Sequence, residues 1–206
     1  NTAKVGYTDE LVSANTDVVV NTAKTGITPA QTDAITNNTA KVGVTTHAIG
    51  ESYGGGIVFF VYDGGQHGLI AATEDQGTAI RWFGGTNTNT RARADGIGAG
   101  FKNTAIIIAN QGSVDGNAFA ATVCNEYSVT EDGVTYGDWY LPSKYELNLL
   151  YLQKVAGNVG GFSNSFYWSS TEYDKDYAWY QFFDFGGFQV FKGKYYGNGV
   201  RAVRAF

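Results

Sequence analysis

Few side chains in this sequence combine the chemistry and the spacing that catalysis requires. The 206 residues include one cysteine, Cys124, and two histidines, His47 and His67. A single cysteine forms no intramolecular disulfide and no cysteine-based zinc cage, so we expect Cys124 to be a small buried apolar residue. Neither histidine belongs to a metal-ligand or nucleophile pattern. These residues favour a protein that is not an enzyme and that uses no cofactor or metal.

The carboxylates are also poorly arranged for acid–base chemistry. Adjacent residues in a strand point to opposite faces, which would separate Glu74 from Asp75. Asp174 and Asp176 could share a side and hold a cation, although a solvated loop is the simpler interpretation. Residues 169–171 (SST) lack a partnering base, so strand packing and hydrogen bonding explain them better than nucleophilic catalysis.

Positive charge is sparse along the chain. The formal net charge is −5, which argues against nucleic-acid binding because phosphate recognition needs concentrated Lys and Arg. The densest cations, Arg91 and Arg93, lie in residues 84–100, which read as a long surface loop. They could contact an anionic ligand or simply be solvated. No run of about 18 apolar residues occurs, so we expect no membrane span.

Aromatic residues are the most concentrated feature, because residues 162–206 hold 16 of the chain's 31. One core cannot absorb so many rings from so short a segment. Several should form an exposed contact surface, which suits recognition of proteins or sugars. With Trp179 and Phe182 inward, Tyr180 and Phe183 would face outward. The turns would expose the candidate ligand-binding residues, which are Tyr173, Asp174, Lys175, Asp176, Tyr177, Phe185, Phe188, Tyr195, Tyr196 and Asn198. The alternatives are that these rings fill a subunit interface or pack within the chain.

Residues 1–46 differ sharply from the rest, with one aromatic residue and eleven threonines. The motif NTAK restarts at Asn1, Asn21 and Asn38, at intervals of 20 and 17 residues, which identifies an internal repeat. The chain opens with Asn inside a repeat, which suggests a piece of a longer protein. After the second copy, Thr28-Pro29-Ala30-Gln31 is a helix-start signature. The helix would run to about Lys41 and end at Gly43.

This helix has a thin apolar stripe, formed by Ile27, Ala30, Ala34, Ile35 and Val42. A short helix with such a stripe is not stable alone. We therefore expect residues 1–50 to form a repeat stalk of short helical segments that assembles as a homotrimer. A disordered linker rich in Thr and Asn is the alternative. Residues 46–56 would be a glycine hinge leading to a head domain at residues 53–206.

The head carries strand and helix signals in a definite order. Residues 56–62 and the LIAAT segment flank a DGGQHG turn and predict a hairpin. A short strand is expected at 80–83, and helices at 103–110, at 116–127 and from the capping box at 143–146 to Gly157. Strands follow at 166–171, 178–185, 188–193 and 199–206, with a turn at Gly186-Gly187. Helices first and a meander afterwards predict the α+β class.

Five apolar residues in this pattern should be core: Trp139, Leu141, Trp168, Val200 and Val203. Arg201 and Arg204 alternate with the last of them and would point outward or pair with carboxylates.

Several motifs resemble the C-terminal domain of bacterial collagen-like adhesins of the Legionella collagen-like protein type. They are GGIVFFVYDGGQHGLIAATEDQ, WYLPSKYELNLLYLQK, YWSSTEY, AWYQFF and the terminal VRAVRAF, in that order over residues 54–206. The resemblance implies a C-type-lectin-like head, a trimer and a place at the tip of a fibrous stalk that adheres to glycosaminoglycans. More distantly, the head resembles the lectin-like variable proteins of diversity-generating retroelements, and the stalk resembles phage tail fibres and bacterial surface fibres with NTAK repeats.

The sequence departs from this family in ways that narrow the expected ligand. Glycosaminoglycan binding implies an electropositive surface, whereas this chain is net negative. The EPN, QPD and WND motifs of calcium-dependent lectins are absent, and the cysteine pair of the related formylglycine-generating enzymes is missing. We therefore expect an extracellular fibre tip, on a bacterial surface or a phage virion, that binds a cell-surface glycan or protein receptor. The alternative is a structural fibre subunit whose aromatic meander joins subunits and binds no ligand.

Overall fold

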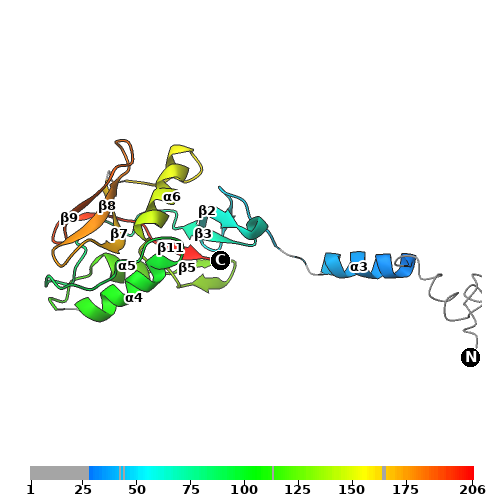
Figure 1. The fold of residues 1–206 in the computed structure, drawn as a ribbon, viewed down its shortest axis with the longest axis horizontal. Helices are drawn as coiled ribbons and strands as arrows, with labels where there is room; N and C mark the ends of the chain where they lie inside the picture. Colours follow the sequence, from blue (N-terminus) through cyan, green and yellow to red (C-terminus); the bar gives the residue numbers. More distant parts are fainter. Residues whose placement is uncertain (1–27, 42, 44, 113, 164–165) are drawn as a thin grey trace, which may run out of the picture. The chain divides into compact units, whose positions relative to one another are not determined.

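The computed structural model describes residues 28–41, 43, 45–112, 114–163 and 166–206 (Figure 1). The chain divides into two compact units, residues 1–44 and residues 45–206. The first two NTAK motifs lie outside the described residues.

In the first unit, helix α3 spans Pro29–Lys41. The Thr28 hydroxyl accepts a hydrogen bond from the Gln31 backbone N–H at 3.2 Å, and the Gln31 side-chain oxygen accepts one from the Thr28 backbone N–H at 2.8 Å. This reciprocal capping confirms the helix start predicted from Thr28, Pro29 and Gln31. The side chains of residues 28–35 are all exposed.

The second unit begins with a four-stranded antiparallel sheet in the order β1-β2-β3-β11. The strands are β1 (Ser52–Tyr53), β2 (Gly56–Tyr62), β3 (His67–Ala71) and β11 (Val203–Ala205), and the 3-10 turn η1 (Asp63–Gly65) joins β2 to β3. The predicted hairpin is confirmed. The predicted glycine hinge at residues 46–56 is wrong, because this segment folds into the unit: the His47 backbone N–H donates to the Gly65 carbonyl at 2.8 Å, and β1 pairs with β2.

A second sheet has five strands in the order β4-β10-β7-β8-β9. Its strands are β4 (Gly77–Ile80), β7 (Phe166–Glu172), β8 (Tyr177–Phe182), β9 (Gln189–Gly193) and β10 (Asn198–Val200). The β10–β7 pairing is parallel and the others are antiparallel. The predicted meander is therefore confirmed, whereas the short strand lies at 77–80 and not at 80–83. A separate hairpin, β5 (Val129–Glu131) and β6 (Val134–Tyr136), was not predicted, although Asp132-Gly133 is a strong hairpin-turn signal.

The single strand predicted at residues 199–206 is two strands in different sheets. β10 ends at Val200 and β11 begins at Val203. Between them, Arg201 is buried and its Nε donates to Asp75 Oδ1 at 2.9 Å. Arg204 Nε donates to Asp138 Oδ1 at 2.6 Å. Both arginines therefore pair with carboxylates. The Arg201 side chain points into the unit, and the chain leaves one sheet and enters the other around this residue.

Three helices pack on the sheets: α4 (Ala99–Gln111), α5 (Ala120–Asn125) and α6 (Lys144–Val155). Each was predicted, but α4 starts four residues early and α5 is shorter than expected. The α6 capping box is present, with Ser143 N–H donating to Glu146 Oε2 at 2.8 Å. In Figure 1, α6 lies on one side of β7 and β8, and α4 and α5 lie on the other.

Two hydrophobic clusters fill the unit. One contains Trp168 and residues of α4 and α5, and the other contains Tyr167 and residues of α6. Because successive strand residues point to opposite faces, β7 separates the two clusters. All five predicted core residues are buried, which confirms that prediction. Phe183 was expected to face outward, but it packs against Tyr167 with ring centroids 4.5 Å apart and is buried.

Candidate functional site

The strongest candidate site is a group of four aromatic side chains on one face of the β8–β9 hairpin. This aromatic cluster consists of Tyr173, Tyr177, Trp179 and Phe191. Strand register places Trp179 opposite Phe191 and Tyr177 opposite Gly193, so Tyr177, Trp179 and Phe191 project from the same face. Tyr173 joins from the preceding turn and stacks on Phe191, with ring centroids 4.1 Å apart and planes 10° from parallel.

The remaining rings of the aromatic cluster pack edge to face. Tyr177 and Trp179 approach Phe191 at centroid distances of 5.7 and 5.9 Å, which is a favourable geometry for aromatic pairs. Tyr173, Tyr177 and Phe191 are nevertheless exposed and Trp179 is half-buried. The cluster is thus held in place by its own contacts while presenting apolar surface and two phenol hydroxyls to a partner.

A lysine borders the aromatic cluster at the start of α6. Lys144 Nζ lies 4.5 Å from the centroid of a Trp179 ring and 3.6 Å from Asp95 Oδ2. The Lys144 carbonyl accepts a hydrogen bond from Gln189 Nε2 at 2.6 Å, which ties α6 to β9. The ammonium group therefore covers one ring face of Trp179. The exposed aromatic surface of the cluster is formed by the other three rings.

The acidic residues of the 173–177 turn are structural in this fold. Asp174 Oδ1 accepts hydrogen bonds from the backbone N–H groups of Asp176 and Tyr177, both at 2.8 Å. Asp176 accepts one from Asn87 Nδ2 at 3.0 Å, and Lys175 Nζ lies 3.6 Å from Asp176. Across the part of the chain that the structure describes, no group of three or more His, Cys, Asp or Glu could hold a metal ion.

A buried ion pair anchors the loops around the aromatic cluster. Lys194 Nζ donates to Glu172 Oε1 at 2.7 Å, and both side chains are fully buried. The same ammonium donates to the carbonyls of Thr88 and Lys175, each at 3.0 Å. Burial lowers the pKa of Lys194, and the hydrogen bond to Glu172 opposes that shift. One cation thus joins three segments that surround the site.

The Glu172 carboxylate also organises the loop that contains the two arginines. It accepts hydrogen bonds from the backbone N–H groups of Thr90 and Arg91, each at 2.8 Å. Arg91 has a φ of 62°, an uncommon conformation for a residue other than glycine. The Arg91 and Arg93 side chains are exposed. The loop is therefore built by the buried carboxylate, with its cations at the surface.

Tyr195 and Tyr196, the tyrosine pair, form a second exposed feature on the β9–β10 turn. Their ring centroids are 4.3 Å apart. Lys192 Nζ lies 4.8 Å from the Tyr196 ring and 5.6 Å from each of the Phe166 and Tyr180 rings. Since Lys194 holds both this turn and the 173–177 turn, the tyrosine pair and the aromatic cluster lie at the same end of the β8–β9 hairpin.

Three predicted site residues do not join this exposed surface. Asn198 was expected to be exposed in a turn but is 1% exposed, because it belongs to β10 and pairs with Ile80. Its Oδ1 accepts a hydrogen bond from Lys192 Nζ at 3.2 Å. Phe185 and Phe188 are 69% and 67% exposed, but they lie on the β8–β9 turn. The six residues of β8 put roughly 17–20 Å between the two ends of the hairpin.

Two residues of the aromatic cluster were missed as contact residues. Phe191 was not singled out, and Trp179 was assigned to the inward face. The alternation of strand residues could have found Trp179, because Tyr177 and Trp179 are two apart and must share a face. Their partner across the hairpin depends on the register, which the Gly186-Gly187 turn sets.

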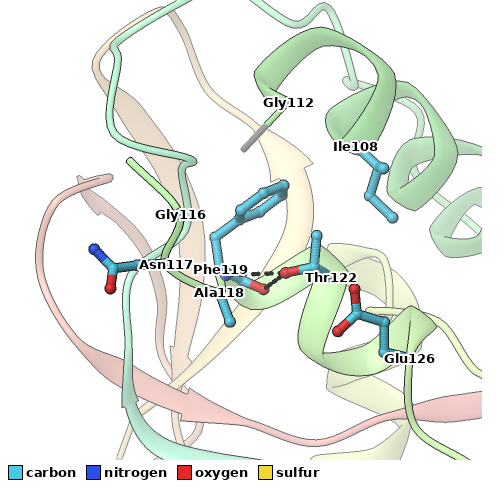
Figure 2. Close-up of a pocket in the computed structure, with 8 residues that line it drawn as sticks. All are labelled: Ile108, Gly112, Gly116, Asn117, Ala118, Phe119, Thr122 and Glu126. Carbon is cyan, nitrogen blue, oxygen red and sulfur yellow. Dashed lines mark hydrogen bonds between the residues drawn. The ribbon is translucent and has the colours of Figure 1, made fainter. Parts of the chain in front are cut away.

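A concave site lies between the C-terminal end of α4 and α5 (Figure 2). This pocket has a volume of about 300 Å³ and is lined by Ile108, Gly112, Gly116, Asn117, Ala118, Phe119, Thr122 and Glu126. Glu126 is the one titratable group among these lining residues. The Thr122 hydroxyl donates to the Phe119 carbonyl at 2.8 Å. The described lining therefore lacks a nucleophile with a neighbouring base.

Three other chemically capable side chains, Cys124, His47 and Ser169, are engaged in packing or hydrogen bonds. Cys124 is buried, and burial raises the pKa of its thiol well above the usual value. His47 stacks on Tyr53 at a centroid distance of 3.7 Å and its Nδ1 lies 2.8 Å from Glu51 Oε1. The Ser169 hydroxyl donates to the Trp179 carbonyl at 2.9 Å. These contacts give Cys124, His47 and Ser169 structural roles.

Comparisons with known proteins give no information about this site. No family model matches the chain, and no curated protein matches it significantly. In the part of the chain that the structure describes, no helix has the length and apolar character needed to cross a bilayer.

Proposed function

We propose that this chain is the tip of an extracellular fibre, on a bacterial surface or a phage virion, that recognises a receptor on another cell. In this proposal the repeat segment is a trimeric stalk, and residues 45–206 are a lectin-like head. The aromatic cluster and the tyrosine pair contact a cell-surface glycan or protein. Binding is non-catalytic and uses no metal.

The observation that carries the proposal is the exposure of ordered aromatic rings on a rigid strand scaffold. Tyr173, Tyr177 and Phe191 are exposed although they pack against one another. Tyr and Trp deliver large contact area at low entropic cost, and their polar groups can hydrogen-bond sugar hydroxyls or a peptide backbone. A site made of neighbouring rings without a general base suits recognition better than chemistry.

The described part of the stalk supports self-association. Helix α3 has 13 residues, and its described side chains, Ile35 among them, are exposed. Isolated helices of this length are marginal in water. Copies of the chain that pack their thin apolar stripes together would stabilise it, and three NTAK motifs in sequence provide repeated contacts of this kind.

The experiment compares binding by two tyrosine variants of the full chain. Replacing Tyr177, Tyr195 and Tyr196 together by alanine should reduce binding to glycan arrays or to receptor-bearing cells at least about tenfold. Tyr62→Ala is the matched control, because Tyr62 is similarly exposed but lies on β2 in the other sheet. Sedimentation would show that both variants keep the native mass. Equal binding by the triple variant and the wild type would refute recognition by this surface.

A structural role in the fibre is the second candidate, and Phe185 and Phe188 favour it. These two rings are about two-thirds exposed and have no polar atom, so they suit an apolar protein interface better than a sugar. If the native chain binds no glycan or cell surface, and replacing Phe185 and Phe188 together by alanine removes the trimer mass, these aromatic residues join subunits and the receptor proposal is wrong.

A further inference from the structure

Two further hollows adjoin the pocket of Figure 2, and the three together form a groove along α5. The hollow before the start of α5 has a volume of about 330 Å³ and shares Asn117 and Ala118 with the pocket. The hollow beyond its end has a volume of about 310 Å³ and shares Glu126. Figure 2 shows Asn117 and Glu126 at opposite ends of the pocket. Since single ligand sites measure roughly 300–1,000 Å³, the groove has room for an extended ligand of several units.

A tyrosine lies at each end of this groove. Tyr195, of the tyrosine pair, lines the first hollow and is 59% exposed. Tyr127 lines the last hollow, and its ring packs edge to face on Trp139 with centroids 5.1 Å apart. Tyrosine offers a flat apolar face and a hydroxyl, which suit the faces and hydroxyls of sugar rings. The groove therefore continues the surface of the tyrosine pair along α5.

Two carboxylates of the groove are available for hydrogen bonds. Glu74 and Glu126 are both exposed, and among the described residues neither side chain is used in an ion pair or a structural hydrogen bond. Each carboxylate has two acceptor oxygens, so it can accept hydrogen bonds from two hydroxyl groups at once. A ligand rich in hydroxyls matches these acceptors.

The charge of the groove disfavours acidic ligands. Arg81 is the cation among its described lining residues, and Asp115 neutralises it through an ion pair. The third carboxylate of the lining, Asp75, is likewise paired with a buried arginine. Glu74 and Glu126 thus leave the groove with negative charge, which repels a ligand of the same sign.

We propose that the groove along α5 binds a neutral oligosaccharide. Its sugar rings stack on Tyr195 and Tyr127, and its hydroxyls donate hydrogen bonds to the carboxylates of Glu74 and Glu126. The inference rests on the proposed function, because it names the receptor as a glycan and extends its contact surface beyond the tyrosine pair. Glycans that carry carboxylate or sulfate groups bind more weakly, since they bring negative charge against the unpaired carboxylates.

A variant that fills the groove tests where the glycan lies. Ala118 is exposed and lines two of the three hollows, so a tryptophan side chain there would occupy them. For Ala118→Trp in the full chain, we expect at least about tenfold weaker binding to neutral oligosaccharides on a glycan array. Ala48→Trp is the matched control, because Ala48 is exposed and lines none of these hollows. Circular dichroism would verify that both variants are folded.

Removing the two unpaired charges tests the choice of ligand. The probes are array pairs of a neutral oligosaccharide and its sialylated or sulfated derivative. The wild type should bind the neutral member at least about fivefold better, and Glu74→Gln with Glu126→Gln, which keeps the side-chain shape, should lose this preference. Asp63→Asn with Asp132→Asn should keep it. This control removes the same charge from exposed turns, and both residues have a φ of 50°, which Asn tolerates.

The outcomes separate this inference from the proposed function. Weaker glycan binding by Ala118→Trp, with the preference lost in the double Gln variant, supports the groove. Full binding by Ala118→Trp, together with a loss in the triple tyrosine variant, overturns the groove and leaves recognition by the tyrosine surface standing. Wild-type binding to cells but to no glycan overturns the groove as a glycan site and leaves a protein receptor. A wild-type preference for the acidic member of each pair overturns the proposed ligand class.

Discussion

At the residue scale, the loops around the aromatic cluster depend on one buried ion pair. Lys194 and Glu172 are both fully buried and lie 2.7 Å apart. Removing one partner of such a pair leaves an uncompensated buried charge, which costs far more than the loss of a surface pair. Lys175 and Asp176, 3.6 Å apart in the adjacent turn, form an exposed pair for comparison.

Lys194→Met should lower the free energy of unfolding by roughly 3–5 kcal/mol, because the buried Glu172 carboxylate would lose its ammonium partner. Lys175→Met should change it by about 0–1 kcal/mol, since solvent screens the exposed pair. Urea denaturation of both variants measures the difference. Equal costs for the two would contradict the assigned role of Lys194.

Asp115 offers a pH-dependent test at the same scale. The hydrogen bond from the Arg81 guanidinium, followed by that from the Asn117 backbone N–H, lowers the pKa of Asp115 to about 2 from a usual value of 3.8. A depressed carboxyl pKa stabilises the folded state above pH 3.8, and this contribution disappears as the pH falls toward 2.

Arg81→Met should raise the pKa of Asp115 toward 3.8, because the largest cause of the shift is removed. The carboxyl carbon chemical shift, followed by NMR against pH, measures it. Lys102→Met removes a cation from exposed α4 and should leave the pKa of Asp115 near 2. A value that stays near 2 in Arg81→Met would show that Arg81 is not the cause.

At the scale of elements, the β8–β9 hairpin determines which aromatic residues meet. Its turn contains Gly186 and Gly187, with φ angles of 67° and 69°, and the register that follows places Phe191 opposite Trp179. A Cβ atom on Gly187 would lie 2.2 Å from Tyr151 Cε1 of α6. The turn therefore needs glycine at residue 187 for its backbone conformation and for its close contact with α6.

Gly187→Ala should destabilise the head by roughly 2–5 kcal/mol, from left-handed backbone strain of about 1–2 kcal/mol and overpacking of about 1–3 kcal/mol. Gly133→Ala is the matched control. Gly133 has a φ of 80° in the β5–β6 turn, but nothing lies within 4 Å of an added Cβ, so backbone strain alone should cost about 1–2 kcal/mol. Thermal unfolding of the two variants would measure the gap, and its absence would disprove the crowding at Tyr151.

At the scale of the whole molecule, the two units differ in what stabilises them. The second unit has two hydrophobic clusters of its own. In the first unit, residues 28–35 are all exposed. In the proposed fibre, contacts between copies of the chain would therefore stabilise α3.

Ile35→Asp should reduce or abolish trimer formation, because it places a charge in the thin apolar stripe of α3 where copies would pack. Thr32→Asp introduces the same charge outside the stripe and should keep the native mass. Analytical ultracentrifugation, with an expected mass three times that of one chain for the wild type and the control, provides the measurement. Identical masses for both variants would rule out the stripe as the contact.

Local signals explain how much of this fold the sequence determined. The capping residues Thr28 and Ser143 act within three residues of themselves, and the apolar periodicity around Trp139 and Trp168 reports burial directly, so helix starts and core residues were predictable. The concentration of aromatic residues after Phe162 also marked the region of the candidate site. Only the tertiary structure decided which rings are neighbours, because the stacking of Tyr173 on Phe191 and the burial of Asn198 depend on strand register and on pairing with β4, more than 100 residues away.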